Sequence, residues 1–313
     1  MATAREICCP AASAKFGFKG SLGPSERARA ACATGQQEQE NRMHATQPPG
    51  TQIDILAVHN LRDLGGWPAG DGRRVRSGLI FHSTDLHAVA DAGLEALARL
   101  GLRTIVDLRT VAEREPQPDR LPDGATQLYC DVLADARNAA PAMLPMIMAD
   151  PRNAGELLGD GKAESLFAQG YRDIVSLPSA LDAFRRYFLV LADETRRPLL
   201  FHCATGKDRT GWAAAATLSL LGVSQDDVFQ DYMLTNLQLL PALQPVFDRF
   251  AAAGGDPDLL KPVLGVQPAY LEAAFEEMRR TFGSLDAYFE DGLKIESGTL
   301  RELRVALTEE RTT

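Results

Sequence analysis

The sequence predicts a layered α/β domain with a helical C-terminal third. Short apolar stretches typical of strands alternate with amphipathic helical stretches from about residue 53 to residue 222. The stretches that follow are almost all helical in pattern. The composition, 45% hydrophobic and 24% charged over 313 residues, is that of a globular chain with a sizeable core.

Four stretches are expected to contain strands, because they are short, apolar and bounded by turn residues. Gly78 weakens the strand prediction for the first of them, because glycine is unfavourable inside a strand. They span residues 75–83, 104–108, 122–130 (a turn and then a strand) and 196–202.

Six helices are expected from apolar residues at helical spacing and from residues that start or stop helices. Pro178 separates the second helix from the third, Gly222 closes the fourth, and Ser224 caps the fifth. They span residues 91–101, 164–177, 179–193, 212–222, 224–240 and 268–283. Residues 133–161 contain three prolines and three methionines and are expected to be irregular, either as a packed loop or as a mobile lid.

Two regions of the chain differ in composition and in hydrophobic periodicity. Residues 1–49 are polar and lack periodicity, so we expect either a disordered tail or upstream sequence, with Met43 the more natural start. Residues 50–313 then form one domain. No catalytic role is expected for the tail under either interpretation.

Charge and cysteine content exclude several classes of protein. The formal net charge of −9 disfavours a nucleic-acid-binding surface, and no apolar run is long enough for integral membrane association. The five cysteines form no CxxC pair, which argues against a zinc ribbon or a disulfide scaffold. We therefore expect a reducing, cytoplasmic location, although secretion without a classical signal peptide stays open.

The segment LLFHCATGKDRTGWAAAA, residues 199–216, carries the chemistry. Cys203 ends an apolar strand, and Arg209 stands six positions later, where a helix begins. A loop between a strand and a helix N-terminus directs backbone N–H groups and the helix dipole at one point, which suits a phosphate or sulfate ion and a thiolate. Gly206 permits the bend, and Arg209 can hold two phosphate oxygens at once.

These parts predict a phosphatase that works through a phosphocysteine intermediate. The Cys203 thiolate attacks phosphorus, and water then hydrolyses the intermediate while Arg209 and the loop amides bind the charged oxygens. Thr210 can donate its hydroxyl to the departing sulfur. No metal or other cofactor is needed, because the loop supplies the positive potential. The loop residues expected to bind substrate are Ala204, Thr205, Gly206, Lys207 and Thr210.

Other interpretations of the loop fit less well. A nucleotide-binding P-loop needs glycine where Phe201 stands and a hydroxyl residue where Asp208 stands. A sulfur-transfer enzyme has no need of arginine followed by Thr-Gly, and a buried structural cysteine near a chance arginine is the remaining alternative. A phosphate-binding module without turnover would have no need of a thiolate.

HCATGKDRTG resembles the signature loop of cysteine-dependent protein tyrosine phosphatases. It is most similar to the bacterial group with HCxxGKDRTG, which also acts on phosphoinositides. Residues 60–66, 76–86, 105–115 and 263–289 resemble further stretches of that family. The resemblance implies a tyrosine-phosphatase-like fold, with a central, mostly parallel sheet flanked by helices and the nucleophile loop at the carboxyl end of a strand. It implies phosphotyrosine proteins or phosphoinositides as substrates.

Two carboxylates are candidates for the general acid that protonates the leaving group. Asp208 lies in the loop and is slightly favoured, while Asp107 ends the strand 104–108; the resemblance implies that both positions matter. The alternatives are that Asp208 braces the loop and that Asp107 forms a salt bridge with Arg109. Lys207 either meets a second anionic group of a phosphoinositide, or it only raises the positive potential of the loop or pairs with a nearby carboxylate.

Further residues are candidates for roles around the loop. His202 is expected to orient the loop from a buried position, and Arg62 with Asp63 either braces the loop or forms a surface turn. Trp67 and Phe81 either wall an aryl pocket or pack in the core. The spacing of His82, Asp85 and His87 gives little support for a metal site.

Overall fold

A five-stranded sheet forms the centre of the molecule. The structure is a computed structural model that describes residues 47–136 and 143–311. The strands are, in spatial order, β1 (Arg62–Asp63), β3 (Ile80–Ser83), β6 (Leu199–His202), β4 (Thr104–Asp107) and β5 (Thr126–Tyr129). All neighbours pair in parallel except β1 with β3. The expected α/β class and mostly parallel sheet are confirmed.

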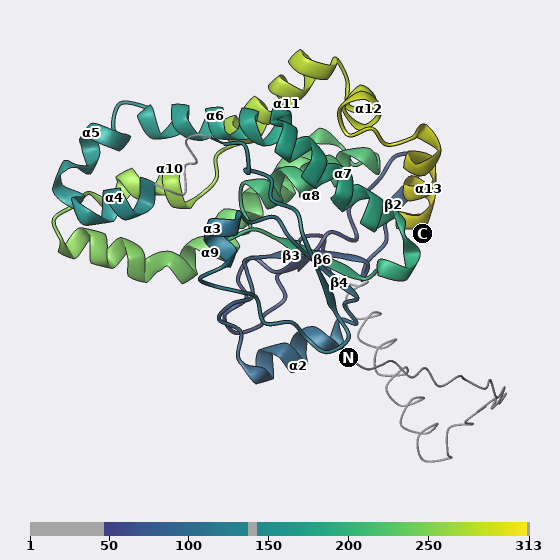
Figure 1. The fold of residues 1–313 in the computed structure, drawn as a ribbon, viewed down its shortest axis with the longest axis horizontal. Coiled ribbons are helices and arrows are strands. Elements are labelled where there is room, and N and C mark those ends of the chain that lie inside the picture. The colour runs from purple at the N-terminus through teal and green to yellow at the C-terminus, as the bar shows by residue number, and fades with distance from the viewer. Residues whose placement is uncertain (1–46, 137–142, 312–313) are drawn as a thin grey trace, which may run out of the picture.

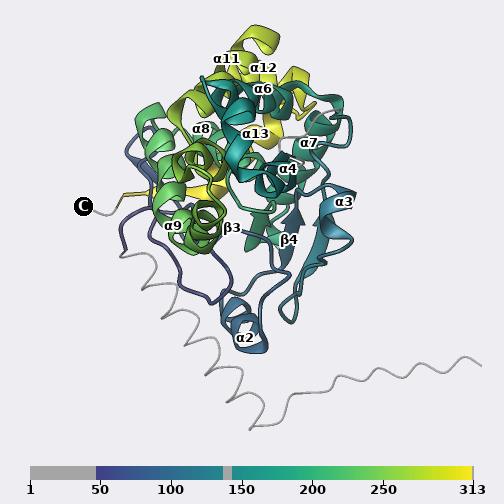
Figure 2. The same ribbon diagram turned by 90° about the vertical axis from the view of Figure 1, so that its left-hand side faces the viewer.

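Helices cover both faces of this sheet (Figures 1 and 2). One helix, α2 (Asp91–Arg99), lies on one face, where it closes a small apolar cluster that includes Phe81 and Leu200. The other face carries the larger core and most of the helices. Four of these helices are α6 (Lys162–Ser176), α7 (Pro178–Ala192), α8 (Arg209–Leu220) and α11 (Pro268–Phe282).

The register of the three central strands places their carboxyl ends at one edge. His202, the last residue of β6, pairs with Ser83 of β3 on one side and with Asp107 of β4 on the other. The loops that leave these strands therefore meet at a common edge, which is where open α/β sheets bind their ligands. Short α3 (Val111–Arg114) follows β4 at the same edge.

The helix expected over 224–240 is longer than the sequence indicates. Ser224 caps it as expected, its hydroxyl accepting from the Asp227 N–H, but α9 (Gln225–Ala252) continues through Pro241 and Pro245. Both prolines are exposed, so carbonyls left without an intrahelical donor can bind water instead. Burial of Phe247 and Phe250 stabilises the extension.

The expectation of an irregular segment over 133–161 is wrong for most of the described residues. They form α4 (Met143–Ala149), a 3₁₀ turn over Pro151–Asn153 (η2) and α5 (Ala154–Leu158), while residues 137–142 lie outside the described part. Ile147, Ala154 and Leu158 are buried in the main core, which explains why helices form despite the prolines. Together with α10 (Lys261–Leu264), α4 and α5 project to one side of the sheet (Figure 1).

The C-terminal third is helical, as expected. After α11 come α12 (Leu285–Ala287), a π-helical turn over Tyr288–Gly292 (η5) and α13 (Ser297–Leu307). Two 3₁₀ turns, η3 (Glu194–Arg196) and η4 (Pro257–Leu260), complete the helical elements of the described chain. A final strand, β7 (Thr308–Glu310), pairs antiparallel with β2 (Arg73–Val75), which ties the C-terminal part of the chain to an early hairpin.

The domain division lies mostly outside the described residues. Residues 1–46 are not described, so the expectation for the segment 1–49 is not tested. At the domain edge the Gly50 carbonyl accepts a hydrogen bond from Gln238 of α9 at 2.8 Å. No helix among residues 47–136 and 143–311 is long and apolar enough to cross a bilayer.

Candidate active site

The loop after β6 places Cys203 at the base of a bowl of backbone amides. Cys203 follows His202 directly and is 1% exposed, and α8 begins at Arg209. Within the described chain, the N–H groups from Ala204 to Asp208 donate no hydrogen bond to another residue. Unused amides at a helix N-terminus are donors for a tetrahedral anion.

Gly206 makes the bend of this loop possible. Its φ of +68° lies in the left-handed region, and an added Cβ would stand 2.4 Å from the carbonyl oxygen of Ser83. Any side chain at this position would therefore push the loop away from β3. The Gly206 carbonyl also accepts a hydrogen bond from the Asn60 amide at 2.8 Å.

Arg209 is held by a carboxylate from a different part of the chain. Its two terminal nitrogens each lie 2.7 Å from an oxygen of Glu113, the third residue of α3. Glu113 also closes a capping box with Thr110 at the start of that helix. Burial alone would raise the pKa of Glu113, but the bonds and charge of Arg209, with those of Thr110, lower it to about 2.

This arrangement leaves one edge of the guanidinium for a ligand. Glu113 uses one N–H from each terminal nitrogen, and a third N–H points at the Leu108 carbonyl at 3.4 Å. The Nε–H and one terminal N–H of Arg209 have no acceptor among the described residues. Two parallel N–H groups on one edge match two oxygens of a phosphate.

Asp208 and Lys207 lie side by side on the flank of the loop. The Lys207 ammonium is 3.1 Å from Oδ1 of Asp208, donates to the Gly265 carbonyl at 3.2 Å, and lies 4.2 Å from the centre of the Phe167 ring. The Lys207 side chain is 6% exposed and that of Asp208 23% exposed. Asp208 is therefore in contact with both solvent and the loop. The Lys207 ammonium, in contrast, is mostly buried in contacts with other protein groups.

Asp107 has a different environment, although it ends a neighbouring strand. Its two oxygens accept from Nε and a terminal nitrogen of Arg109, each at 2.9 Å, and it is fully buried. Arg109 also pairs with Asp119 at 2.9 Å. This is the salt bridge that the sequence offered as the alternative for Asp107.

His202 joins the same buried network. Its Nε2 lies 3.1 Å from Asp119, and its Nδ1 lies 3.1 Å from the Cys203 carbonyl oxygen. Burial would lower the pKa of His202, but Asp119 and Asp107 outweigh it and raise the pKa. Burial would likewise raise the pKa of Asp119, yet His202 lowers it to about 2. The contact of Nδ1 with the Cys203 carbonyl links His202 to the backbone at the nucleophile, and the ring is buried as expected.

A second set of bonds braces the loop from the side of β1. Arg62 forms a bidentate pair with Asp231 of α9, both distances 3.0 Å, and donates to the side chain of Asn60. Asn60 in turn holds Gly206. Asp63 instead accepts from the backbone of Gly65 and Gly78, so of the expected pair only Arg62 is connected with the loop, and it acts through Asn60.

The remaining candidates divide between the site and the core. The hydroxyl of Thr210 is buried without a hydrogen-bond partner in the described chain. Trp67 and Phe81 are buried in the two apolar clusters.

His82 is buried beside Phe201, whereas His87 pairs with Asp85, so these three residues do not share one site. The cluster Asp107, Asp119 and His202 has metal-ligand spacing, but Arg109 contacts both of its carboxylates.

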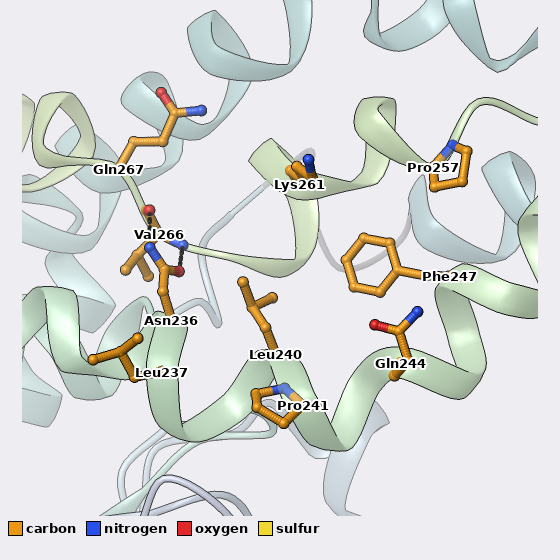
Figure 3. A pocket seen from close by; sticks show the side chains of 10 residues that line it. All are labelled: Asn236, Leu237, Leu240, Pro241, Gln244, Phe247, Pro257, Lys261, Val266 and Gln267. Atoms are coloured by element: carbon orange, nitrogen blue, oxygen red, sulfur yellow. Dashed lines mark hydrogen bonds between the residues drawn. The ribbon is translucent and has the colours of Figure 1, made fainter.

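A groove of about 810 Å³ lies beside the loop, between α9 and residues 257–267 (Figure 3). The Asn236 side chain bonds the N–H and the carbonyl of Val266, and the neighbouring Gly265 carbonyl holds Lys207. The groove therefore shares a wall with the segment that contacts the loop. Its apolar lining consists of Leu237, Leu240, Pro241, Phe247, Pro257 and Val266.

Sequence reasoning did not identify Glu113, Asp119 or Asn60 as parts of this site. Glu113 had one usable signal, because Thr110 and Glu113 have the spacing of a capping box at a helix start. Asp119 and Asn60 lie in turn-rich segments without a distinguishing pattern. Their roles come only from the contacts they make in the folded chain.

Comparison with known proteins is consistent with this geometry. The profile of the tyrosine phosphatase family matches residues 53–309. A Cupriavidus necator protein named as a candidate tyrosine-protein phosphatase is 31% identical over 245 residues, covering 78% of this chain and 85% of its own length. The triple specificity protein phosphatase PtpB of Mycobacterium tuberculosis is 31% identical over 279 residues, covering 81% and 98%. A tyrosine-protein phosphatase of Nostoc commune is 26% identical over 168 residues, covering 54% and 52%.

Proposed function

The chain belongs to the tyrosine phosphatase family and is a phosphatase of phosphotyrosine, and on that premise we propose how its residues carry out the reaction. The observation that carries the proposal is the bowl of unused amides around Cys203, closed by the free edge of Arg209. A phosphate ester bound there has phosphorus above the sulfur and its three non-bridging oxygens on the amides and the guanidinium.

The first step forms a phosphocysteine. The Cys203 thiolate attacks phosphorus, the bond from phosphorus to the phenolic oxygen breaks, and Asp208 gives its proton to that oxygen. In the second step, water attacks phosphorus and the sulfur departs as a thiolate. The proton of the water passes to Asp208, which restores the starting state. The unpartnered hydroxyl of Thr210 is suited to donate to the departing sulfur.

Asp208 is the better candidate for the acid on geometric grounds. A proton donor must reach the leaving group, and Asp208 is partly exposed at the flank of the loop. Asp107 is fully buried and both of its oxygens are taken by Arg109. We therefore assign proton transfer to Asp208 and a structural ion pair to Asp107.

We also propose phosphoinositides as additional substrates. The loop HCATGKDRTG resembles that of the bacterial group with this wider range, and Lys207 adds a positive charge beside the site. To meet a second phosphate of an inositol headgroup, the ammonium must exchange its contact with Asp208 or Gly265 for the new one. Inorganic phosphate or sulfate is expected to occupy the loop in the absence of substrate.

The expected setting follows from the chemistry of the site. We propose a reducing, cytoplasmic location, where the Cys203 nucleophile stays reduced. Neither nucleic acid nor integral membrane association is part of the proposal.

Turnover of an aryl phosphate in the presence of a metal chelator tests the proposed catalytic role of the loop. Wild-type protein should release phosphate, while Cys203→Ser should bind the ester without turnover because the amides and Arg209 remain. Phosphate binding without turnover by the wild-type chain would instead identify a binding module. Turnover by Cys203→Ser within tenfold of wild type would overturn the assignment of the nucleophile.

A further inference from the structure

Three buried tyrosines pack together next to the N-terminus of α8, where the carboxylate that we assign as the general acid stands. Tyr171 comes from α6, Tyr232 from α9 and Tyr270 from α11, and none is more than 2% exposed. The Tyr171 ring lies 6.2 Å from the ring of Tyr232 and 5.8 Å from that of Tyr270. None of these residues belongs to the signature loop, so the proposed catalytic steps do not yet use them.

Two of the tyrosines are joined by a short hydrogen bond. The hydroxyl oxygens of Tyr171 and Tyr232 are 2.6 Å apart. Burial, together with the charge of Asp208, holds the pKa of both phenols well above the usual value, so both keep their protons. A pair of hydroxyls has two protons and uses only one of them between its members. The second proton is left for another acceptor.

The neighbouring acceptor is Asp208. Its charge acts on both phenols, and the Tyr171 hydroxyl is within hydrogen-bonding reach of its carboxylate. Oδ1 of Asp208 is buried and accepts no well-aligned hydrogen bond from the described residues, although Lys207 lies 3.1 Å away. A relay in which Tyr232 donates to Tyr171 and Tyr171 donates to Asp208 uses both phenol protons.

Gly211 makes room for this pair. It stands three residues after Asp208, on the same side of the first turn of α8. A Cβ at Gly211 would lie 3.0 Å and 3.2 Å from two ring carbons of Tyr232 and 4.0 Å from the Tyr171 hydroxyl. Tyr171 and Tyr232 thus pack against the backbone that carries Asp208. A larger residue at position 211 would push the tyrosines away from that backbone.

We propose that Tyr171 and Tyr232 are positioning residues that hold the Asp208 carboxyl toward the leaving group. The proposal rests on the assignment of Asp208 as the acid. The two phenols do not touch substrate. They hold the Asp208 carboxylate, which restricts its rotamers while one oxygen stays available. A proton donor held in this way loses less entropy on reaching the transition state.

A leaving-group series measures this role. Tyr171→Phe and Tyr232→Phe each remove one oxygen and keep the packed ring. We expect kcat to fall about five- to tenfold for phenyl phosphate, whose leaving group needs a proton, and less than about twofold for a nitrophenyl phosphate, with KM nearly unchanged.

Tyr187→Phe is the matched control. Tyr187 of α7 is equally buried, and its hydroxyl bonds Thr217 at 3.0 Å, away from Asp208. It should lose stability to a similar extent but show the wild-type dependence on leaving group. Equal behaviour of Tyr187→Phe and Tyr171→Phe would mean that only general packing is at work, and the proposal would be overturned.

A double variant separates this inference from the assignment of the acid. If the tyrosines act through Asp208, Tyr171→Phe should have no further effect on phenyl phosphate turnover in an Asp208→Asn background. An undiminished further loss would contradict the relay while leaving Asp208 as the acid. If Asp208→Asn itself shows no dependence on leaving group, the assignment of the acid fails and the inference fails with it.

Discussion

Arg209 and Glu113 form a bidentate ion pair with both N–O distances at 2.7 Å, although 96 positions separate them in the chain. The pair joins the N-terminus of α8 to that of α3 and leaves one edge of the guanidinium without an acceptor among the described residues. Glu113 thereby fixes the residue that must bind the charged oxygens of the transition state. It does so without contacting them.

The first prediction concerns this pair. Glu113→Gln removes the charge but keeps the shape, so Arg209 loses its bidentate partner and gains freedom to rotate. We expect kcat/KM for an aryl phosphate to fall about ten- to a hundredfold, because small misplacement of a positioning group is costly. Steady-state kinetics measure the change, and Glu115→Gln, at the end of the same short helix, is the control. Activity within twofold of wild type would show that Arg209 is held by other contacts.

The second prediction distinguishes the two aspartates. Asp208→Asn should reduce turnover of phenyl phosphate about a hundredfold or more and that of a nitrophenyl phosphate far less. Asp107→Asn should lower both equally, with a lower melting temperature, because it weakens the bond to Arg109. The opposite pattern of leaving-group dependence would move the acid to Asp107.

The third prediction concerns Lys207 and the substrate range. Lys207→Ala should weaken phosphoinositide turnover more than aryl phosphate turnover, because only the inositol headgroup presents a second anionic group. Phosphate release from both substrates measures the ratio. Equal losses would mean that the ammonium serves Asp208 and the common phosphate, as its contacts with Asp208 and Gly265 also allow.

The fourth prediction is a dependence of stability on pH through Asp119. The pKa of this carboxyl falls from 3.8 to about 2 on folding, so its stabilisation is present above about pH 4 and is lost as the pH falls toward 2. The raised pKa of His202 has the opposite sign, and its contribution is lost as the pH rises above 6.5. The ion pair of Asp119 and His202 therefore stabilises the folded state most between about pH 4 and pH 6.5.

Asp119→Asn should remove about 2 kcal/mol of this stabilisation near pH 5 and flatten both slopes. Urea denaturation across the pH range measures it, with the exposed Asp123→Asn as the control. Parallel pH profiles for wild type and Asp119→Asn would show that the buried network is not the source of the dependence.

The sequence predicts those features that depend on neighbours in the chain. The nucleophile loop, the strands around it and the helix caps are short patterns, and Ser224 caps its helix as expected. The end of that helix was misplaced because the exposed positions of Pro241 and Pro245, and the burial of Phe250, depend on the rest of the fold.

The partners of the loop could not be predicted in the same way. Glu113 holds Arg209 from α3, and Asp119 contacts His202 from the segment between α3 and β5. Tyr232 of α9 packs against the first turn of α8. None has a local signal that connects it with Cys203, because such contacts are set by the packing of distant elements. The sequence places Asp107 at a strand end. It leaves open whether Asp107 is the general acid or forms a salt bridge with Arg109, and the structure shows the salt bridge.

Formation of a phosphocysteine at Cys203 is the central claim. Wild-type protein mixed with an aryl phosphate and quenched in acid should show, by peptide mass spectrometry, one phosphoryl group on the peptide that contains Cys203. The label should be absent in Cys203→Ser and should persist longer in Thr210→Ala, which lacks the hydroxyl proposed to assist the second step. A phosphoryl group on another residue, or full turnover by Cys203→Ser, would contradict the account.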